Sequence, residues 1–141
     1  MGPNIAIVIV SLASLCSVQA MFDTKVLMDH MQGCMKKHEV SEKDLEDVNK
    51  EDFSEEKLKC FMTCIGERIG YIKDDEFSEK GAMEAVEFMF EKNNTKEKEK
   101  AREIIKDCTQ KIKEKDVKGC ELGPVAGACL KKGVQDHKIM P

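Results

Sequence analysis

Apolar residues recur at three- and four-residue intervals along most of the chain, and this spacing predicts amphipathic helices. Because the chain has no strand-like alternation and no Asn-Gly or Asp-Gly hairpin turn, we expect no sheet. Six helical segments follow, which makes the predicted fold all-α. The apolar faces of the first and third segments are Leu27, Met31, Cys34, Met35 and His38, and Leu58, Phe61, Met62, Ile65 and Ile69. Those of the last three are Ala82, Ala85, Val86, Met89 and Phe90, then Ala101, Ile104, Ile105, Cys108 and Ile112, and finally Ala126, Cys129, Leu130 and Gly133.

Polar residues and breakers mark the ends of these segments. A Ser hydroxyl can cap a helix by accepting a hydrogen bond from a free N–H of its first turn. We therefore expect Ser41 to cap a short acidic helix over residues 42–50, and Ser54 and Ser78 to cap the third and fourth helices. The fifth begins at Asn94 or Thr95 and ends at Gly119, and Pro124 suits the first turn of the sixth.

The first twenty residues carry no charged side chain and include an uninterrupted apolar run over residues 5–10. That run falls short of the roughly 20 apolar residues that a membrane span needs. It is followed by Val18-Gln19-Ala20, a small-x-small pattern typical of signal peptidase sites. We expect a signal peptide over residues 1–20 and a secreted, extracellular domain over residues 21–141. The alternative is a buried N-terminal strand or helix.

Removing the signal peptide would also remove Cys16, so that the seven cysteines become six. An even number in an oxidising compartment favours disulfides. They would compensate for a thin core, since 35% of the residues are charged and 5% are aromatic. Each disulfide typically adds about 2–4 kcal/mol.

The charge pattern excludes several classes of function. Lys and Glu are interleaved along every segment and the formal net charge is −4, so we expect no nucleic-acid partner. No second apolar run favours membrane insertion. Because no nucleophile motif is present and the histidines have no evident orienting partner, we expect neither an enzyme nor a cofactor.

Helical geometry limits how the six cysteines pair. Cys60 and Cys64 lie one turn apart, with Cβ atoms about 5–6 Å from each other, too far for a disulfide. Cys120 and Cys129 are separated by roughly 13 Å at helical rise and are excluded as well. The other pairings stay open. A zinc site is the rival explanation, but Cys-x3-Cys has no second close pair that would complete four ligands.

The third helix raises the question of a core or a cavity. At about 100° per residue, Cys60 and Cys64 point away from the stripe that includes Phe61 and Ile65. The stripe could pack into a solid core, or it could line a cavity braced by disulfides.

The cysteine spacing resembles that of the insect odorant-binding protein family, the pheromone- and general-odorant-binding proteins. An export signal precedes Cys-x25-Cys-x3-Cys-x43-Cys-x11-Cys-x8-Cys, and this order covers the whole mature chain. The resemblance implies six helices around an internal apolar pocket, with pairing of Cys34 with Cys64, Cys60 with Cys120 and Cys108 with Cys129. It favours a cavity, for which the helical faces supply ten candidate wall residues: Phe61, Met62, Ile65, Ile69, Met83, Val86, Met89, Phe90, Ile105 and Val134.

The resemblance implies a secreted carrier that binds odorants or pheromones. We expect one polar group, Tyr71, His30 or a backbone carbonyl, to orient the ligand. Alternatives are a carrier of a lipid or hormone in haemolymph or a gland secretion, and a helical interaction protein that has no pocket. The implied partners are a small apolar ligand and a chemosensory receptor, and the implied state is a monomer or a weak homodimer.

Two further signals lie near the chain's later segments. Some family members release ligand on acidification through a C-terminal tail. Here Val134, Ile139 and Met140 could cover the pocket until His137 is protonated; the alternative is a frayed terminus. Asn93-Asn94-Thr95 is a glycosylation sequon.

Overall fold

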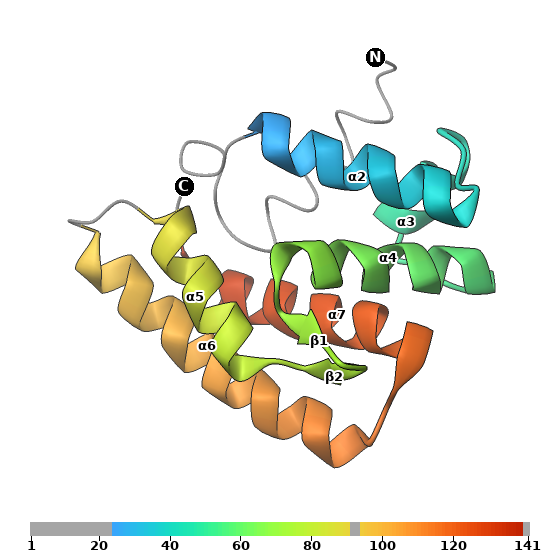
Figure 1. Ribbon diagram of the computed structural model, residues 1–141. Helices are drawn as coiled ribbons and strands as arrows, with labels where there is room; N and C mark the ends of the chain where they lie inside the picture. Colours follow the sequence, from blue (N-terminus) through green and yellow to red (C-terminus); the bar gives the residue numbers. More distant parts are fainter. Residues whose placement is uncertain (1–23, 91–93, 140–141) are drawn as a thin grey trace.

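The described part of the chain contains six α-helices (Figure 1), and the predicted all-α class is confirmed. The computed structural model describes residues 24–90 and 94–139. The predicted signal peptide and Asn93 lie outside them. The helices are α2 (Thr24–His38), α3 (Asp44–Asn49), α4 (Glu56–Ile69), α5 (Glu79–Met89), α6 (Thr95–Lys115) and α7 (Leu122–Asp136), with a 3-10 turn, η1 (Gly119–Glu121), before α7.

The expectation of no sheet was wrong. Two short antiparallel strands, β1 (Ile72–Lys73) and β2 (Glu76–Phe77), connect α4 to α5. Asp74 and Asp75 form the turn and have φ angles of 52° and 66°. Two successive left-handed residues suit a tight hairpin, and Asp tolerates this conformation better than most side chains do. The sequence therefore contained a hairpin turn, but without the glycine that usually marks one.

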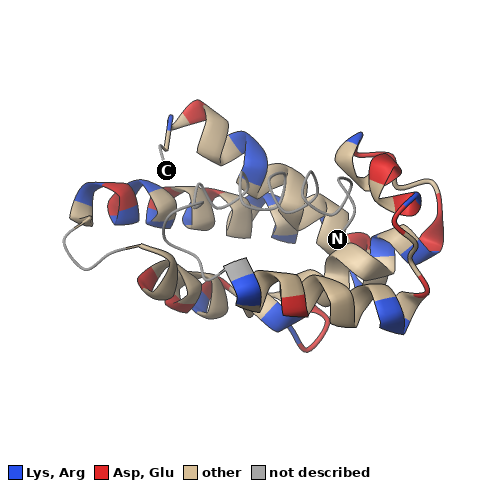
Figure 2. Cartoon of the chain, turned by 90° about the horizontal axis from the view of Figure 1, so that it is seen from above, with Lys and Arg blue, Asp and Glu red and all other residues tan. Residues whose placement is uncertain are grey.

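Helix α4 lies at the centre of the fold (Figure 1). It packs against α2 on one side and against α7 on the other. Helices α6 and α7 run antiparallel, and α5 packs on α6. Acidic and basic residues are interspersed over the described elements (Figure 2). None of the helices in the described ranges is long and apolar enough to cross a membrane.

The buried side chains form two clusters rather than one. The first joins α2, α3 and α4, and the second joins α5, α6 and α7 with the residues of the hairpin. The α4 stripe belongs to the first cluster, where Phe61 and Ile65 are fully buried. Ile69 packs against both. The stripe on α4 is therefore part of a solid core.

Reciprocal hydrogen bonds hold the start of α3. The N–H of Asp44 donates to the Ser41 hydroxyl oxygen (3.2 Å), and the N–H of Ser41 donates to the Asp44 carboxylate (2.9 Å). Lys57, at the start of α4, donates to the same carboxylate at 2.8 Å. The reciprocal bonds resemble a capping box, but α3 begins at Asp44 with Lys43 at the N-cap position, so Ser41 lies two residues before the cap position of the observed helix.

The other two predicted caps had different outcomes. The Ser78 hydroxyl accepts a hydrogen bond from the N–H of Gly81 at 2.9 Å, as expected of a cap. Ser54 does not cap α4, because that helix begins one residue later than this role requires, with Glu55 at the N-cap position.

Helices α4 and α7 meet backbone to backbone. The Thr63 hydroxyl accepts a hydrogen bond from the N–H of Gly123 (2.9 Å) and donates to the carbonyl of Cys120 (2.9 Å). A Cβ atom on Gly123 would lie 2.2 Å from the backbone nitrogen of Thr63. Any residue larger than glycine would therefore push α7 away from α4.

We predict that Gly123→Ala lowers the free energy of unfolding by about 1–3 kcal/mol, because the new methyl group overpacks against helix backbone. Urea unfolding of the oxidised protein measures the change. Ala128→Ser, at an exposed position of the same helix, is the control and should alter stability by less than about 0.5 kcal/mol. If the two substitutions changed the free energy of unfolding equally, the close contact between Gly123 and the backbone of α4 would be contradicted.

Acid should weaken the attachment of α3. The hydrogen bond from Lys57 lowers the pKa of the Asp44 carboxyl from 3.8 to about 2, with a further contribution from Ser41. The unfolded chain therefore takes up this proton first, so stabilisation present above pH 4 is lost as the pH falls toward 2. We expect a loss on the order of 1–2 kcal/mol, absent from Asp44→Asn.

Urea unfolding at pH 5 and pH 2.5 measures this loss. Glu39→Gln removes a negative charge at an exposed position nearby and controls for net charge. The same pH dependence in Asp44→Asn and the original protein would contradict the assignment to Asp44.

Candidate ligand-binding cavity

Three disulfides tie the helices together. They link α2 to α4, α4 to η1, and α6 to α7, so α4 is held twice and α5 carries no cysteine. These are the three pairs that the family resemblance implies. The bonds, with the Cα–Cα distances that they span, are Cys34–Cys64 (5.8 Å), Cys60–Cys120 (4.4 Å) and Cys108–Cys129 (5.8 Å).

The first of these disulfides lies inside the core. Cys34 is fully buried and Cys64 is 4% exposed, and both belong to the cluster that contains Phe61 and Ile65. The expectation that the α4 cysteines point away from the apolar stripe is wrong for Cys64. A residue 100° around a helix from its neighbour can still face a core formed by two partner helices.

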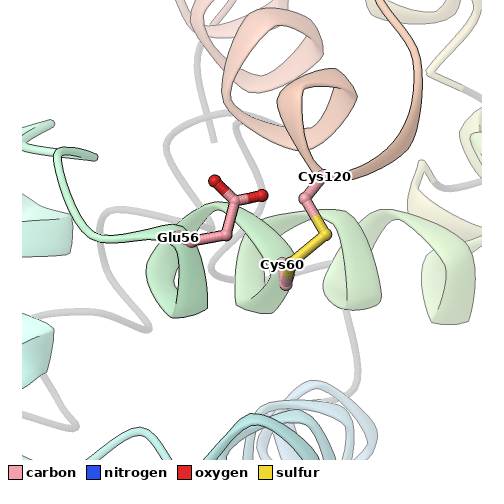
Figure 3. Close-up of side chains that lie close together, drawn as sticks. All are labelled: Glu56, Cys60 and Cys120. Carbon is pink, nitrogen blue, oxygen red and sulfur yellow. A yellow bond between two sulfur atoms is a disulfide. The ribbon is translucent and has the colours of Figure 1, made fainter.

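Glu56, Cys60 and Cys120 form the group of described residues that comes nearest to metal-ligand spacing (Figure 3). Their potential ligand atoms lie within 4.8 Å of one another. However, the two sulfur atoms are bonded to each other, so neither is a thiolate. Zinc binds cysteine as thiolate, and a single exposed carboxylate does not make a metal centre.

A small apolar cavity lies between α5, α6 and α7, with a volume of about 50 Å³. Its lining is apolar except for the phenol group of Tyr71. Three alanines on α5 and α6 leave the space that larger side chains would fill. The twelve lining residues are Tyr71, Ala82, Ala85, Val86, Met89, Phe90, Ala101, Ile104, Ile105, Leu130, Val134 and Ile139.

The structure brings half of the predicted wall residues to this cavity. Val86, Met89, Phe90, Ile105 and Val134 line it. The other five do not. Phe61, Met62 and Ile65 pack in the first cluster, Ile69 lies between the clusters, and Met83 packs on the second cluster without reaching the cavity.

The seven other lining residues were not among the ten predicted wall residues, for two reasons. The alanines and Ile104 were placed on the correct helical faces, but a face shows only that a residue is buried, not that it borders a void. Tyr71 and Ile139 lie outside the helices, where periodicity gives no signal. Tyr71, one of the polar groups predicted to orient a ligand, lines the cavity, and so does Ile139, predicted to cover the pocket. His30 lies on α2, away from the cavity lining.

The cavity is small for a ligand. A void of about 10–15 Å³ holds one water, and one of about 150 Å³ holds benzene. At about 50 Å³, the cavity lies between these limits. A larger guest must displace wall side chains, and Met89 is suited to this because its unbranched thioether chain changes rotamer readily.

The C-terminal segment reaches the cavity. Ile139 is 6% exposed and its N–H donates to the carbonyl of Val134 at 3.2 Å. The imidazole Nδ1 of His137 lies 3.9 Å from the carboxylate of Glu103. Protonating His137 would add attraction to Glu103, which opposes the expected loosening of the tail. Met140 lies outside the described residues.

The other two histidines lie on α2. Burial lowers the pKa of His30, and the nearby Arg68 lowers it further. Burial also lowers the pKa of His38, with a smaller contribution from Lys37. In both cases burial favours the neutral imidazole, and neither histidine lines the cavity.

The sequence matches a model of the PBP/GOBP family over residues 21–133. The chain belongs to this family. The helices and the disulfides described above are therefore those of a PBP/GOBP protein.

Two solved structures support the same fold. Odorant-binding protein dmelOBP28a from Drosophila melanogaster superposes with a TM-score of 0.61 at 20% identity, over 82% of this chain and 95% of that one. Fatty acid binding protein OBP56a from the oral disk of the blowfly Phormia regina gives a TM-score of 0.54 at 26% identity, over 78% and 90%.

The sequence is also similar to general odorant-binding protein 56a of Drosophila melanogaster. The two are 30% identical over 69 residues, which is 48% of this chain and 50% of that relative. The match thus spans half of the length of that PBP/GOBP protein.

We predict that removing Cys60–Cys120, by Cys60→Ala with Cys120→Ala, lowers the free energy of unfolding by about 4 kcal/mol, because the bond closes a long loop. Urea unfolding without reductant measures this loss. In the chain without its predicted signal peptide, which carries Cys16, the single change Cys60→Ala should leave one free thiol, at Cys120. Iodoacetamide labelling and peptide mass spectrometry locate that thiol, and labelling at any other cysteine would contradict the pairing.

Proposed function

We propose that the chain is a secreted carrier that encloses a small apolar molecule between α5, α6 and α7. The observation that supports this function is the cavity wall, in which eleven of the twelve lining residues are apolar. Such a wall offers a ligand almost nothing except contact with carbon and sulfur atoms. Binding would be driven by transfer of apolar surface from water, at about 25 cal/mol per Å².

The wall also restricts the polar part of the ligand. Tyr71 supplies the one side-chain polar atom of the lining, so a ligand with one hydroxyl or carbonyl group fits best. We assign volatile odorants or pheromones as the ligand class, in keeping with the name of the Drosophila relative.

A second candidate is a carrier of fatty acids. It is favoured by the blowfly protein, which is named as a fatty acid binding protein and superposes over most of the chain. Both candidates require the same cavity to expand, and they differ in the head group that Tyr71 would meet.

The same residues favour binding over catalysis. The six cysteines of the described ranges are all bonded in disulfides. The cavity lining contains no His, Asp, Glu or Lys. Apart from the Tyr71 phenol, a ligand held there would meet no side chain that could act as an acid, a base or a nucleophile.

We predict that Ala101→Leu weakens binding at least tenfold, because three added carbon atoms occupy a cavity of about 50 Å³. The measurement is displacement of the fluorescent probe N-phenyl-1-naphthylamine by decan-1-ol. Glu99→Leu, an exposed position on the same helix, is the matched control and should bind normally.

Ile105→Val is a second test variant, which keeps the prediction testable if Ala101→Leu does not fold. It removes one methylene from the wall at a cost of about 0.5–1.5 kcal/mol, so affinity should be kept or improved. Unchanged affinity in folded Ala101→Leu would place the ligand elsewhere, and an original protein that binds neither probe nor alcohol would refute the carrier function.

A further inference from the structure

A second concave site lies on the outside of the bundle, in the groove between α6 and α7. It has a volume of about 420 Å³, within the range of about 300–1,000 Å³ that is usual for small-molecule sites. Ile104 lines both this groove and the internal cavity, so its side chain separates the two. The groove is therefore distinct from the proposed carrier cavity and needs no expansion to admit a ligand.

The floor of the groove is apolar. Ile112 is buried, Val125 and Cys129 are half-buried, and all three line the groove. At Gly133 the backbone of α7 approaches α6 so closely that a Cβ would lie 2.4 Å from Cγ2 of Ile104. The two helices thus close the floor beneath the groove, while the exposed Ala128 leaves it open above.

The rim of the groove carries an excess of positive charge. Three lysines and two aspartates line it, on a chain whose formal net charge is −4. Both aspartates are engaged within their own helices, with Lys111–Asp107 at 2.8 Å and Lys132–Asp136 at 3.6 Å. Lys115, in the last turn of α6, makes no ion pair among the described residues. It is the rim cation available to an external anion.

We propose that this groove binds an anionic amphiphile, with its carboxylate at Lys115 and its aliphatic chain along Val125 and Cys129. The apolar floor provides most of the affinity, because a single exposed ion pair contributes little. Lys115 provides the preference for an anionic head group and fixes the direction in which the chain lies. This site is independent of the proposed carrier function, which concerns the other side of Ile104.

The test compares decanoate with decan-1-ol, each below its micelle concentration, on the isotopically labelled, oxidised full-length protein. Decanoate is expected to shift the amide NMR signals of Val125, Ala128 and Gly133, and decan-1-ol to leave them in place. Lys115→Glu should weaken decanoate binding about tenfold, because it replaces attraction by repulsion at the head group. Lys106→Glu makes the same charge change at an exposed position of α6 outside the groove and should have no such effect.

Three results would overturn the proposal: decanoate shifts confined to cavity residues such as Val86 and Ile105, equal weakening by both charge reversals, or loss of groove binding in Ala101→Leu. Failure of decan-1-ol to bind would count against the carrier function alone. If decanoate still shifts the amide signals of the groove residues in Ala101→Leu, the result supports the external site, whether or not the cavity binds a ligand.

Discussion

The fold depends on α4 being fixed to both halves of the molecule. Its disulfides connect it to α2 on one side and to η1 on the other. Where α4 and α7 touch, the Thr63 hydroxyl accepts a hydrogen bond from the N–H of Gly123. Because two of these contacts are covalent and the third lies where α7 packs directly on the backbone of α4, we expect α4 to shift least when a ligand enters. The first cluster is therefore a rigid support, and any adaptable space must lie in the second.

The second cluster has such space because its helices present small side chains to one another. Ala82, Ala85 and Ala101 face the cavity, whereas the α4 stripe offers large residues such as Phe61 to α2 and α3. Close packing normally fills a core to crystal-like density, so a void lined by alanines is a local exception. On their outer faces α6 and α7 carry charged side chains, and these line the external groove between the two helices.

Sequence patterns predicted the helices well and the site only in part. Periodicity identified each buried face because burial alone sets the apolar spacing. It could not show which faces meet, and so Phe61 was assigned to the cavity although it packs against α2 and α3. Tyr71 and Ile139 reach the cavity from connecting segments that have no period. The hairpin was missed because Asp74-Asp75 takes the place of glycine.

The expansion that a guest requires costs least at α5. This helix forms one wall of the cavity but has no disulfide, whereas α6 and α7 are joined through Cys108–Cys129. Near its end, Glu87 pairs with Lys98 at 3.0 Å and with Arg102 at 2.6 Å, and the Glu87 side chain is half exposed. The pair with Arg102 lies at the surface and contributes about 0–1 kcal/mol. Lys98 is only 6% exposed, so its pair with Glu87 is not a surface pair of this kind. The start of α5 is held more firmly, since a Cβ on Gly81 would meet the carbonyl oxygen of Gly70. An α5 that swings outward from a fixed start would widen the cavity at Met89 and Phe90 while leaving every disulfide in place.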